Sequence, residues 1–246
     1  MSFSNRNNYW LSSYAGVNSV SFVAKLGFPP TTFEHVKTEN TANPCYGVSW
    51  TENDRILCAQ NKQVEVRHET DLRLDKTLEY PGIDYVNSSA IVNGIIYTKA
   101  KSHTAKKYIT YSGSLEEPAQ QILHSEAAEN PNNITQLSAN KDYIASIDYV
   151  NKALKVFSST TEEHLFDIQL TGFKHQYGVH LTADGVLVTD LSGGKLCKYA
   201  LTSSSVPIWT CTGLPEPAGI TTDESGFIYV CNGNKPIINI ISPAGK

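Results

Sequence analysis

Apolar residues along the chain alternate with polar ones in short runs, and the runs end at glycine, asparagine or aspartate. This is the pattern of antiparallel strands joined by tight turns. The clearest unit has expected strands at 219–222, 227–231 and 237–242, with turns at 223–226 and 232–235. No stretch shows the 3.6-residue periodicity of a long helix. The pattern therefore predicts an all-β protein.

The same unit recurs upstream, at 177–199 and 133–157 and, more weakly, at 89–98, 47–58 and 8–22. A small residue closes the second strand of each unit: Ser12, Cys58, Thr98, Ser146, Thr189 and Cys231, with gaps of 46, 40, 48, 43 and 42 residues. Fourth strands are expected at 32–37, 76–80, 120–125, 164–170 and 206–212. Repeats of about 40–50 residues are typical of the four-stranded blades of a β-propeller.

The repeat predicts a single-domain, six-bladed β-propeller of four-stranded antiparallel blades. The expected blades span 1–40, 41–81, 82–128, 129–172, 173–214 and 215–246. The first unit lacks its first strand and the last lacks its fourth. Residues 1–7 are therefore expected to add a strand that closes the ring, because a ring left open exposes unpaired strand edges. Five blades plus an N-terminal arm is the alternative.

Composition restricts the class of protein and the compartment. With 246 residues, 18% charged and 40% hydrophobic, the chain can bury a core without disulfides or metal. A net charge of −4 argues against nucleic-acid binding by the whole surface, although a local basic patch is compatible with it. No apolar run suits a membrane span or signal peptide, and the five cysteines form no C-x-x-C pair. We expect a cytoplasmic protein with reduced thiols and no membrane partner.

The C-terminal units resemble a known repeat. Residues 217–230, PAGITTDESGFIYV, with the following GNKPI and ISPAGK, are similar to NHL repeats. The linking run WTCTGLPEPAG, at 209–219, resembles the C-terminal propellers of invertebrate tripartite-motif (TRIM-NHL) proteins. The resemblance is good over 173–246 and weakens toward the N-terminus. It implies a protein- or RNA-binding module, although some related six-bladed propellers are metal-dependent lyases or hydrolases. The chain shows no RING, B-box or coiled-coil pattern, so ubiquitin-ligase activity is not expected of it.

Cations end the expected turns between second and third strands: Lys62, Lys106 or Lys107, Lys152, Lys195 and Lys235, with Lys99, Lys101 and His103 beside the third turn. In a propeller these turns share one face with the connections that lead into each first strand. We call it the loop face. A rim of cations there would attract RNA phosphates. Alternatively, these lysines finish hairpins and pair with acids such as Asp148 and Asp190.

Aromatic residues precede or begin several first strands on the same face: Tyr46, Tyr85 and Tyr177, with His175 and Gln176 beside them. Tyrosine and lysine together can stack on bases, sugars or peptide side chains. Packing between blades is the alternative role for these rings. The predicted ligand-binding residues are Tyr46, Tyr85, Lys106, Lys107, Lys152, His175, Tyr177, Lys195 and Lys235.

Residues suited to catalysis are sparse. Of seven histidines, only His175 and His180 lie near each other, and His180 is expected to face the central channel. Matched repeat positions add hydroxyls from Ser49, Thr135 and Thr221, a poor ligand set for a metal ion. No G-x-S-x-G motif is present. We therefore expect no cofactor, metal or catalytic residue, and structural roles for the tryptophans Trp10, Trp50 and Trp209.

These observations predict a non-enzymatic recognition module whose loop face binds a protein or peptide. A mildly acidic chain with a broad rigid rim favours that partner. RNA binding through the lysines and tyrosines of the loop face is one alternative. A carbohydrate-binding lectin is another, although the seam residues do not repeat between units. A metal-dependent propeller hydrolase or lyase is the third.

Overall fold

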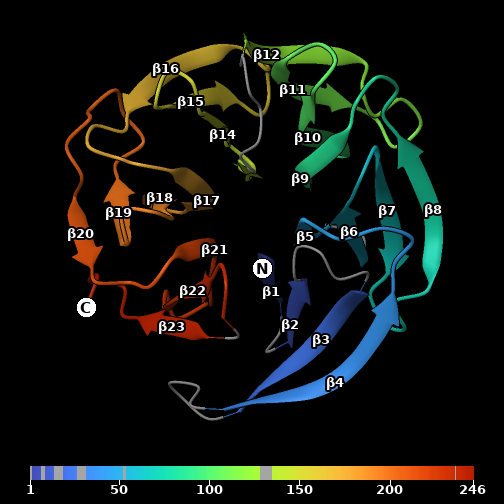
Figure 1. Ribbon diagram of the computed structural model, residues 1–246, viewed down its shortest axis with the longest axis horizontal. Helices are drawn as coiled ribbons and strands as arrows, with labels where there is room; N and C mark the ends of the chain where they lie inside the picture. Colours follow the sequence, from blue (N-terminus) through green and yellow to red (C-terminus); the bar gives the residue numbers. More distant parts are fainter. Residues whose placement is uncertain are drawn as a thin grey trace.

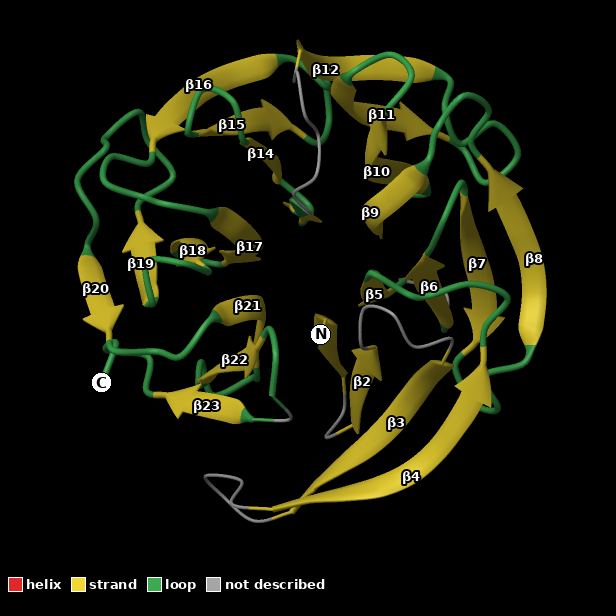
Figure 2. Cartoon of the chain, viewed as in Figure 1, coloured by secondary structure: helices red, strands yellow, loops and turns green. Residues whose placement is uncertain are grey.

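The computed structural model describes residues 2–6, 9–13, 19–26, 32–51, 54–127, 135–235 and 237–246. All regular structure in these ranges is β, and it forms six antiparallel sheets around a central axis (Figures 1 and 2). Within the same ranges there is no helix long and apolar enough to cross a membrane. The expected all-β propeller of small antiparallel sheets is therefore confirmed.

Five sheets have four strands each, in sequence order from the axis to the rim. The first two blades hold β1 (Ser2–Arg6), β2 (Tyr9–Ser13), β3 (Ser19–Leu26) and β4 (Thr32–Asn40), then β5 (Gly47–Trp50), β6 (Arg55–Ala59), β7 (Gln63–His68) and β8 (Leu74–Glu79). The third and fourth hold β9 (Tyr85–Val92), β10 (Ile95–Ser102), β11 (Lys107–Gly113) and β12 (Gln121–Ala127), then β13 (Leu137–Ala139), β14 (Tyr143–Asp148), β15 (Ala153–Ser158) and β16 (His164–Gln169). The fifth holds β17 (Gln176–Thr182), β18 (Gly185–Asp190), β19 (Lys195–Tyr199) and β20 (Trp209–Thr212), and the three-stranded sheet holds β21 (Pro217–Thr222), β22 (Ile228–Asn232) and β23 (Ile238–Ile241).

The prediction of six four-stranded blades is wrong in its count, because the four-stranded blades number five. The three-stranded sheet β21–β23 stands between the fifth and first blades (Figure 1). Residues 2–6 do not form an arm: β1 pairs with β2 from Ser2↔Ser13 to Arg6↔Tyr9 and is the inner strand of its own blade. β1 also lies against β5 and β21. The ring therefore closes because inner strands of neighbouring sheets pack together, and not through a blade that combines strands from both ends of the chain.

The apolar core lies in the seams between neighbouring blades. Ile147 and Leu154 of the fourth blade pack with Val179 and Val188 of the fifth. Strands such as β18 and β22 are buried along their whole length, because each blade is covered by a neighbour on both faces. This explains why their sequences are nearly continuous apolar runs. All five cysteines are free thiols, and four of them are buried in these seams or strands.

Candidate functional site

A row of aromatic rings crosses the loop face from the second blade to the third. The rings of Tyr46 and Tyr85 meet edge to face with centroids 5.6 Å apart, and the His103 ring lies 5.6 Å from Tyr85. The two tyrosines are half-buried and His103 is exposed. Tyr46 lies in the connection into β5, Tyr85 begins β9, and His103 follows β10. We call these three residues the first aromatic row.

A second aromatic row joins the third, fourth and fifth blades on the same face. The Tyr149 ring lies 6.2 Å from Tyr108 and 5.6 Å from His175, and His175 lies 6.1 Å from Tyr177. Tyr108 and Tyr177 are buried, so Tyr149 and His175 supply the accessible surface of this row. The structure therefore brings Tyr46 together with Tyr85, and His175 with Tyr177, as two separate groups.

Burial favours the uncharged form of two accessible rings, one in each row. It raises the pKa of Tyr46, and the nearby Tyr85 adds to this effect. Burial also lowers the pKa of His175, although the charge of Asp190 opposes the change. At neutral pH Tyr46 and His175 therefore present neutral aromatic surfaces, which suit stacking and apolar contact.

Two lysines of the expected basic cluster are not available to a ligand. Lys99 is fully buried, and its Nζ lies 2.8 Å from the Glu126 carboxylate. Lys101 is 6% exposed, and its Nζ lies 4.3 Å from the centre of the Tyr85 ring. β10 is buried on both faces between two blades, so side chains that look solvated in the sequence are enclosed in the seams.

The other turn lysines have mixed roles. Lys195 is held by the Gly172 carbonyl, 2.9 Å from its Nζ, and by the Phe173 ring at 4.3 Å. Lys106 and Lys152 occupy the left-handed position of their turns, with φ of 51° and 50°, so their backbones complete the hairpins. Their side chains are nevertheless exposed. The accessible cations among the predicted binding residues are Lys106, Lys107, Lys152 and Lys235.

A hollow of about 440 Å³ opens on the loop face between the second and third blades. It is lined by Lys62, Glu79, Tyr80, Pro81, Gly82, Ile83, Asp84, Ser102, Thr104 and Ala105. Asp84 connects this hollow to the first aromatic row, because it precedes Tyr85 and accepts the backbone N–H of His103 at 2.7 Å. The hollow and the row therefore form one surface that carries both signs of charge.

A buried carboxylate organises the loop face of the fifth blade. Asp190 is fully buried at the end of β18 and accepts backbone N–H groups from Lys174, His175 and Gly193 at 2.8–2.9 Å. It thereby fixes both the connection that carries His175 and the turn that precedes Lys195. Sequence reasoning treated Asp190 only as a partner for lysine. Its position at the end of a second strand, matched by Asp148 and Asn232, was the available signal.

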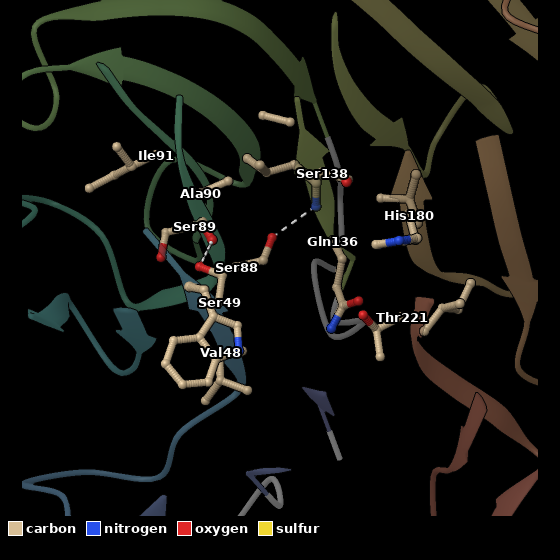
Figure 3. Close-up of a pocket in the computed structure, with 16 residues that line it drawn as sticks. Val48, Ser49, Ser88, Ser89, Ala90, Ile91, Gln136, Ser138, His180 and Thr221 are labelled. Carbon is tan, nitrogen blue, oxygen red and sulfur yellow. Dashed lines mark hydrogen bonds between the residues drawn. The ribbon is translucent and has the colours of Figure 1, made fainter. Parts of the chain in front are cut away.

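The central channel contains a cavity of about 170 Å³ lined by both polar and apolar side chains (Figure 3). His180, Thr221 and Gln136 lie on one side, and Ser49 lies across from them with Ser88. Ser49 donates to the Ser89 carbonyl at 2.6 Å. The described lining residues include no carboxylate, so the channel offers a metal ion few ligands.

At one position of the channel wall, the alignment of the sequence repeats predicts the wrong residue. Thr135 is fully buried and does not line the cavity, whereas Ser138 of β13 occupies the matched position. β13 begins at Leu137, which is later than the repeat alignment implied. Trp50 lines the cavity, and the Trp209 ring packs against the three-stranded sheet. The side chain of Trp10 lies outside the described residues.

His180 is expected to make stability depend on pH. Its Nε2 lies 3.1 Å from Thr222 Oγ1, and burial lowers its pKa to about 4. An unfolded histidine has a pKa of about 6.5, so between these values the unfolded state binds more protons. Stability should fall by roughly 3 kcal/mol as the pH drops from 6.5 to 4. Urea unfolding of wild type and His180→Gln across this range measures the effect; equal pH slopes for the two proteins would contradict it.

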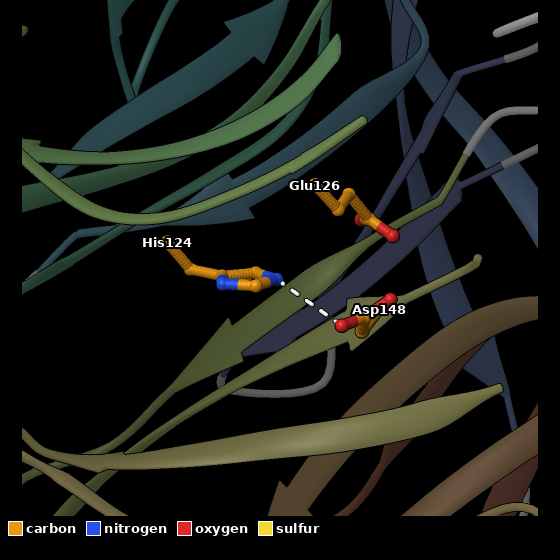
Figure 4. A group of neighbouring side chains, drawn as sticks. All are labelled: His124, Glu126 and Asp148. Atoms are coloured by element: carbon orange, nitrogen blue, oxygen red, sulfur yellow. Dashed lines mark ion pairs between the residues drawn. The ribbon is translucent and has the colours of Figure 1, made fainter. Parts of the chain in front are cut away.

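His124, Glu126 and Asp148 bring their ligand atoms within 4.8 Å of one another (Figure 4). His124 Nε2 lies 3.3 Å from Asp148, and Lys155 Nζ lies 3.9 Å from the same carboxylate. Lys99 pairs with Glu126, so each carboxylate already has a cationic partner. A divalent ion would have to compete with both lysines. The cluster is therefore an ion-pair network across the seam between the third and fourth blades.

The pKa directions agree with a network of paired charges. Burial raises the pKa of Glu126, although the charge of Lys99 opposes it. Burial acts in the same direction on Asp148, but hydrogen bonds from His124 and Asn151 hold its pKa well below the usual range. Glu126 also accepts the Val150 N–H at 3.0 Å, which ties β12 to the next blade. Sequence reasoning missed Glu126, because nothing local indicates that an outer-strand acid meets Lys99.

Comparison with known proteins defines a fold class. No protein-family model matches the sequence, and no curated protein matches it. A protein of unknown function from Bacteroides caccae is 16% identical over 96% of this chain and 90% of its own, with a TM-score of 0.70. Hydrazine synthase from Kuenenia stuttgartiensis is 9% identical over 100% of this chain and 84% of its own, with a TM-score of 0.71. BamB from Moraxella catarrhalis is 8% identical over 97% of this chain and 70% of its own, with a TM-score of 0.58. At these identities the likeness shows the β-propeller fold alone.

Proposed function

We propose that this β-propeller is a non-enzymatic recognition module that binds an extended segment of a partner protein on its loop face. The observation that supports the proposal is the first aromatic row beside the loop-face hollow. Half-buried tyrosines held by edge-to-face contacts are rigid anchors that lose little conformational entropy on binding. Such rings carry much of the energy of protein interfaces.

The charges around the hollow favour a peptide over RNA. Lys62 faces the same hollow as Glu79 and Asp84, a mixture that suits a peptide with both signs of charge. RNA binding depends on several phosphate contacts made together. Burial of Lys99 and Lys101 removes two of the eight lysines that suggested RNA binding. The exposed lysines Lys106, Lys107, Lys152 and Lys235 are spread over three sheets.

The NHL resemblance of residues 173–246 supports the same class of function, and we retain it as part of the proposal. Glycan binding is less well supported, because the two aromatic rows differ in composition and do not form equivalent sites. A metal-dependent hydrolase or lyase activity is also less well supported. The channel offers His180 and hydroxyls, and the carboxylates of the His124 cluster are paired with lysines.

Selection from a displayed library of random 12-residue peptides tests the proposal. Peptides that bind the wild type should bind Tyr85→Ala and Tyr46→Ala at least tenfold more weakly, a loss of about 1.4 kcal/mol or more. Tyr143→Ala is the matched control, because this half-buried tyrosine begins β14 on the opposite face. Melting temperatures confirm that each variant folds.

Two outcomes would contradict the proposal. One is a set of selected peptides that bind both loop-face variants as tightly as the wild type. The other is an absence of peptide binding together with binding to poly(U) that weakens steeply with salt. For single-stranded RNA the logarithm of the affinity falls with the logarithm of salt by about 0.7 per phosphate neutralised.

A further inference from the structure

Two buried side chains in the cavity of the central channel have unused hydrogen-bonding groups. Gln136 is 6% exposed and Thr221 is 4% exposed, and both line the cavity (Figure 3). Within the part of the chain that the structure describes, neither the Gln136 amide nor the Thr221 hydroxyl has a hydrogen-bond partner. Buried polar groups without a partner are rare in proteins, and they point to a water or a ligand that would satisfy them.

His180 adds a third polar group to the same wall of the cavity. Its Nε2 lies 3.1 Å from Thr222 Oγ1, which leaves Nδ1 as a further donor or acceptor. Burial lowers the pKa of His180 to about 4, so the ring is uncharged at neutral pH. Gln136 precedes β13, while His180 and Thr221 belong to β17 and β21. Neutral polar groups from three successive sheets therefore converge on one space.

Hydroxyl groups on the opposite wall are held in position but keep part of their bonding capacity. Ser49 Oγ donates to the Ser89 carbonyl at 2.6 Å, so its lone pairs still accept. Ser88 Oγ accepts the Leu137 N–H at 2.8 Å, so its proton is still a donor. A hydroxyl offers one donor and two acceptor sites, and one fixed bond sets its direction. Both walls are thus organised before any ligand arrives.

The charge of the cavity limits which molecules it can hold. Its described lining residues include no aspartate, glutamate, lysine or arginine. A charged molecule would lose its hydration there without gaining a counter-charge. A purely apolar molecule would leave the Gln136 amide and the Thr221 hydroxyl unsatisfied. The matching chemistry is an uncharged molecule with several hydrogen-bonding groups.

Volume and apolar lining narrow the choice further. The cavity measures about 170 Å³, and an apolar cavity of roughly 150 Å³ in another protein holds one benzene ring. Val48, Val179 and Ile220 also line it, so C–H groups of a ligand find apolar contacts. A sugar or sugar alcohol combines C–H surfaces with hydroxyls on all sides. A planar heterocycle, in contrast, offers hydrogen bonds only around its edge, whereas the polar groups here lie on opposite walls.

We propose that the cavity in the central channel binds a small uncharged polyol, either a free monosaccharide or a sugar alcohol. Gln136 and Thr221 bind hydroxyls of this ligand from one wall, and Ser49 and Ser88 bind hydroxyls from the other. The apolar side chains contact its C–H groups. This site lies among the inner strands and not on the loop face, so it goes beyond the peptide-binding function proposed above.

Titration calorimetry on the full chain tests the site. The probes are erythritol, D-ribose, D-glucose, D-galactose and myo-inositol, each added separately. At least one of them should bind with a Kd below about 1 mM. The phosphate ester of the best-bound probe should bind at least tenfold more weakly, because the described lining of the cavity has no cation to receive it.

Two variants of nearly unchanged shape locate the binding. Gln136→Leu and Thr221→Val should each weaken binding of the best probe at least tenfold. Each variant removes a buried polar group that has no partner, so the melting temperature without ligand should not fall. Gln121→Leu and Thr171→Val are the matched controls, because they change exposed residues of the same two types. Ser49→Ala replaces either cavity variant that fails to fold.

Three results would overturn this proposal. The first is no binding of any of the five probes at millimolar concentration, which would assign the cavity to water. The second is binding that the cavity variants leave unchanged. The third is Gln136-dependent binding of uracil or adenine without binding of any polyol. Tyr85→Ala should leave polyol binding unchanged, so failure here is distinguishable from failure of the loop-face proposal.

Discussion

Replacing Lys99 by methionine is expected to lower the free energy of unfolding by about 3–5 kcal/mol. Lys99 is fully buried beside Glu126, so its removal leaves a carboxylate in the seam without its cation. For a chain of this length the melting temperature should fall by roughly 6–20 °C. Urea unfolding followed by tryptophan fluorescence measures the free-energy change, and calorimetry measures the temperature.

Two comparisons isolate the cause. Lys107→Met removes an exposed lysine from the same blade and should change stability by about 0.5 kcal/mol or less. The double variant Lys99→Met with Glu126→Gln removes both charges but keeps an acceptor for Val150, so it should recover much of the loss. A cost below about 1 kcal/mol for Lys99→Met would show that the pair contributes little.

The second large effect is expected from Asp190→Ala, at about 3–5 kcal/mol. The variant leaves three backbone N–H groups, those of Lys174, His175 and Gly193, without their acceptor. The connection that carries His175 should then become mobile, so amides at 172–176 should exchange faster. Hydrogen exchange together with urea unfolding measures both consequences.

Matched variants separate this capping role from a simple loss of charge. Asp190→Asn keeps one acceptor oxygen in the same shape and should cost about half as much. Asp142→Ala removes an exposed aspartate from a hairpin turn on the opposite face and should have little effect. If Asp190→Ala were as stable as Asp142→Ala, water must satisfy the freed N–H groups, and Asp190 would not organise the loop face.

Repetition is the property of this sequence that carries most information about its fold. Each unit alternates apolar and polar residues around a turn, so strand positions follow from local chemistry alone. The blade count was harder to predict, because it depends on what pairs with the terminal units. Residues 2–6 pair within the first blade, and β23 lacks an outer partner among the described strands. Neither fact is encoded in a local pattern.

The candidate site was predictable only in part. The placement of Tyr46, Tyr85 and His175 on one face follows from the order of strands in a blade. The exposure of each lysine side chain could not be predicted in this way, because it depends on which seam between blades encloses that side chain. Lys99 and Lys107 stand eight positions apart in similar surroundings, yet one is fully buried and the other exposed.

The sequence by itself determined a β-propeller, its strand order and the set of residues at its loop face, since these depend on periodicity and turn chemistry within each unit. Only the tertiary structure decided which cations are exposed, that Glu126 and Asp148 meet across a seam, and that β23 has no outer partner among the described strands. These features arise where separate units touch. Contact between units depends on three-dimensional packing of residues far apart in the chain, which no repeat within the sequence specifies.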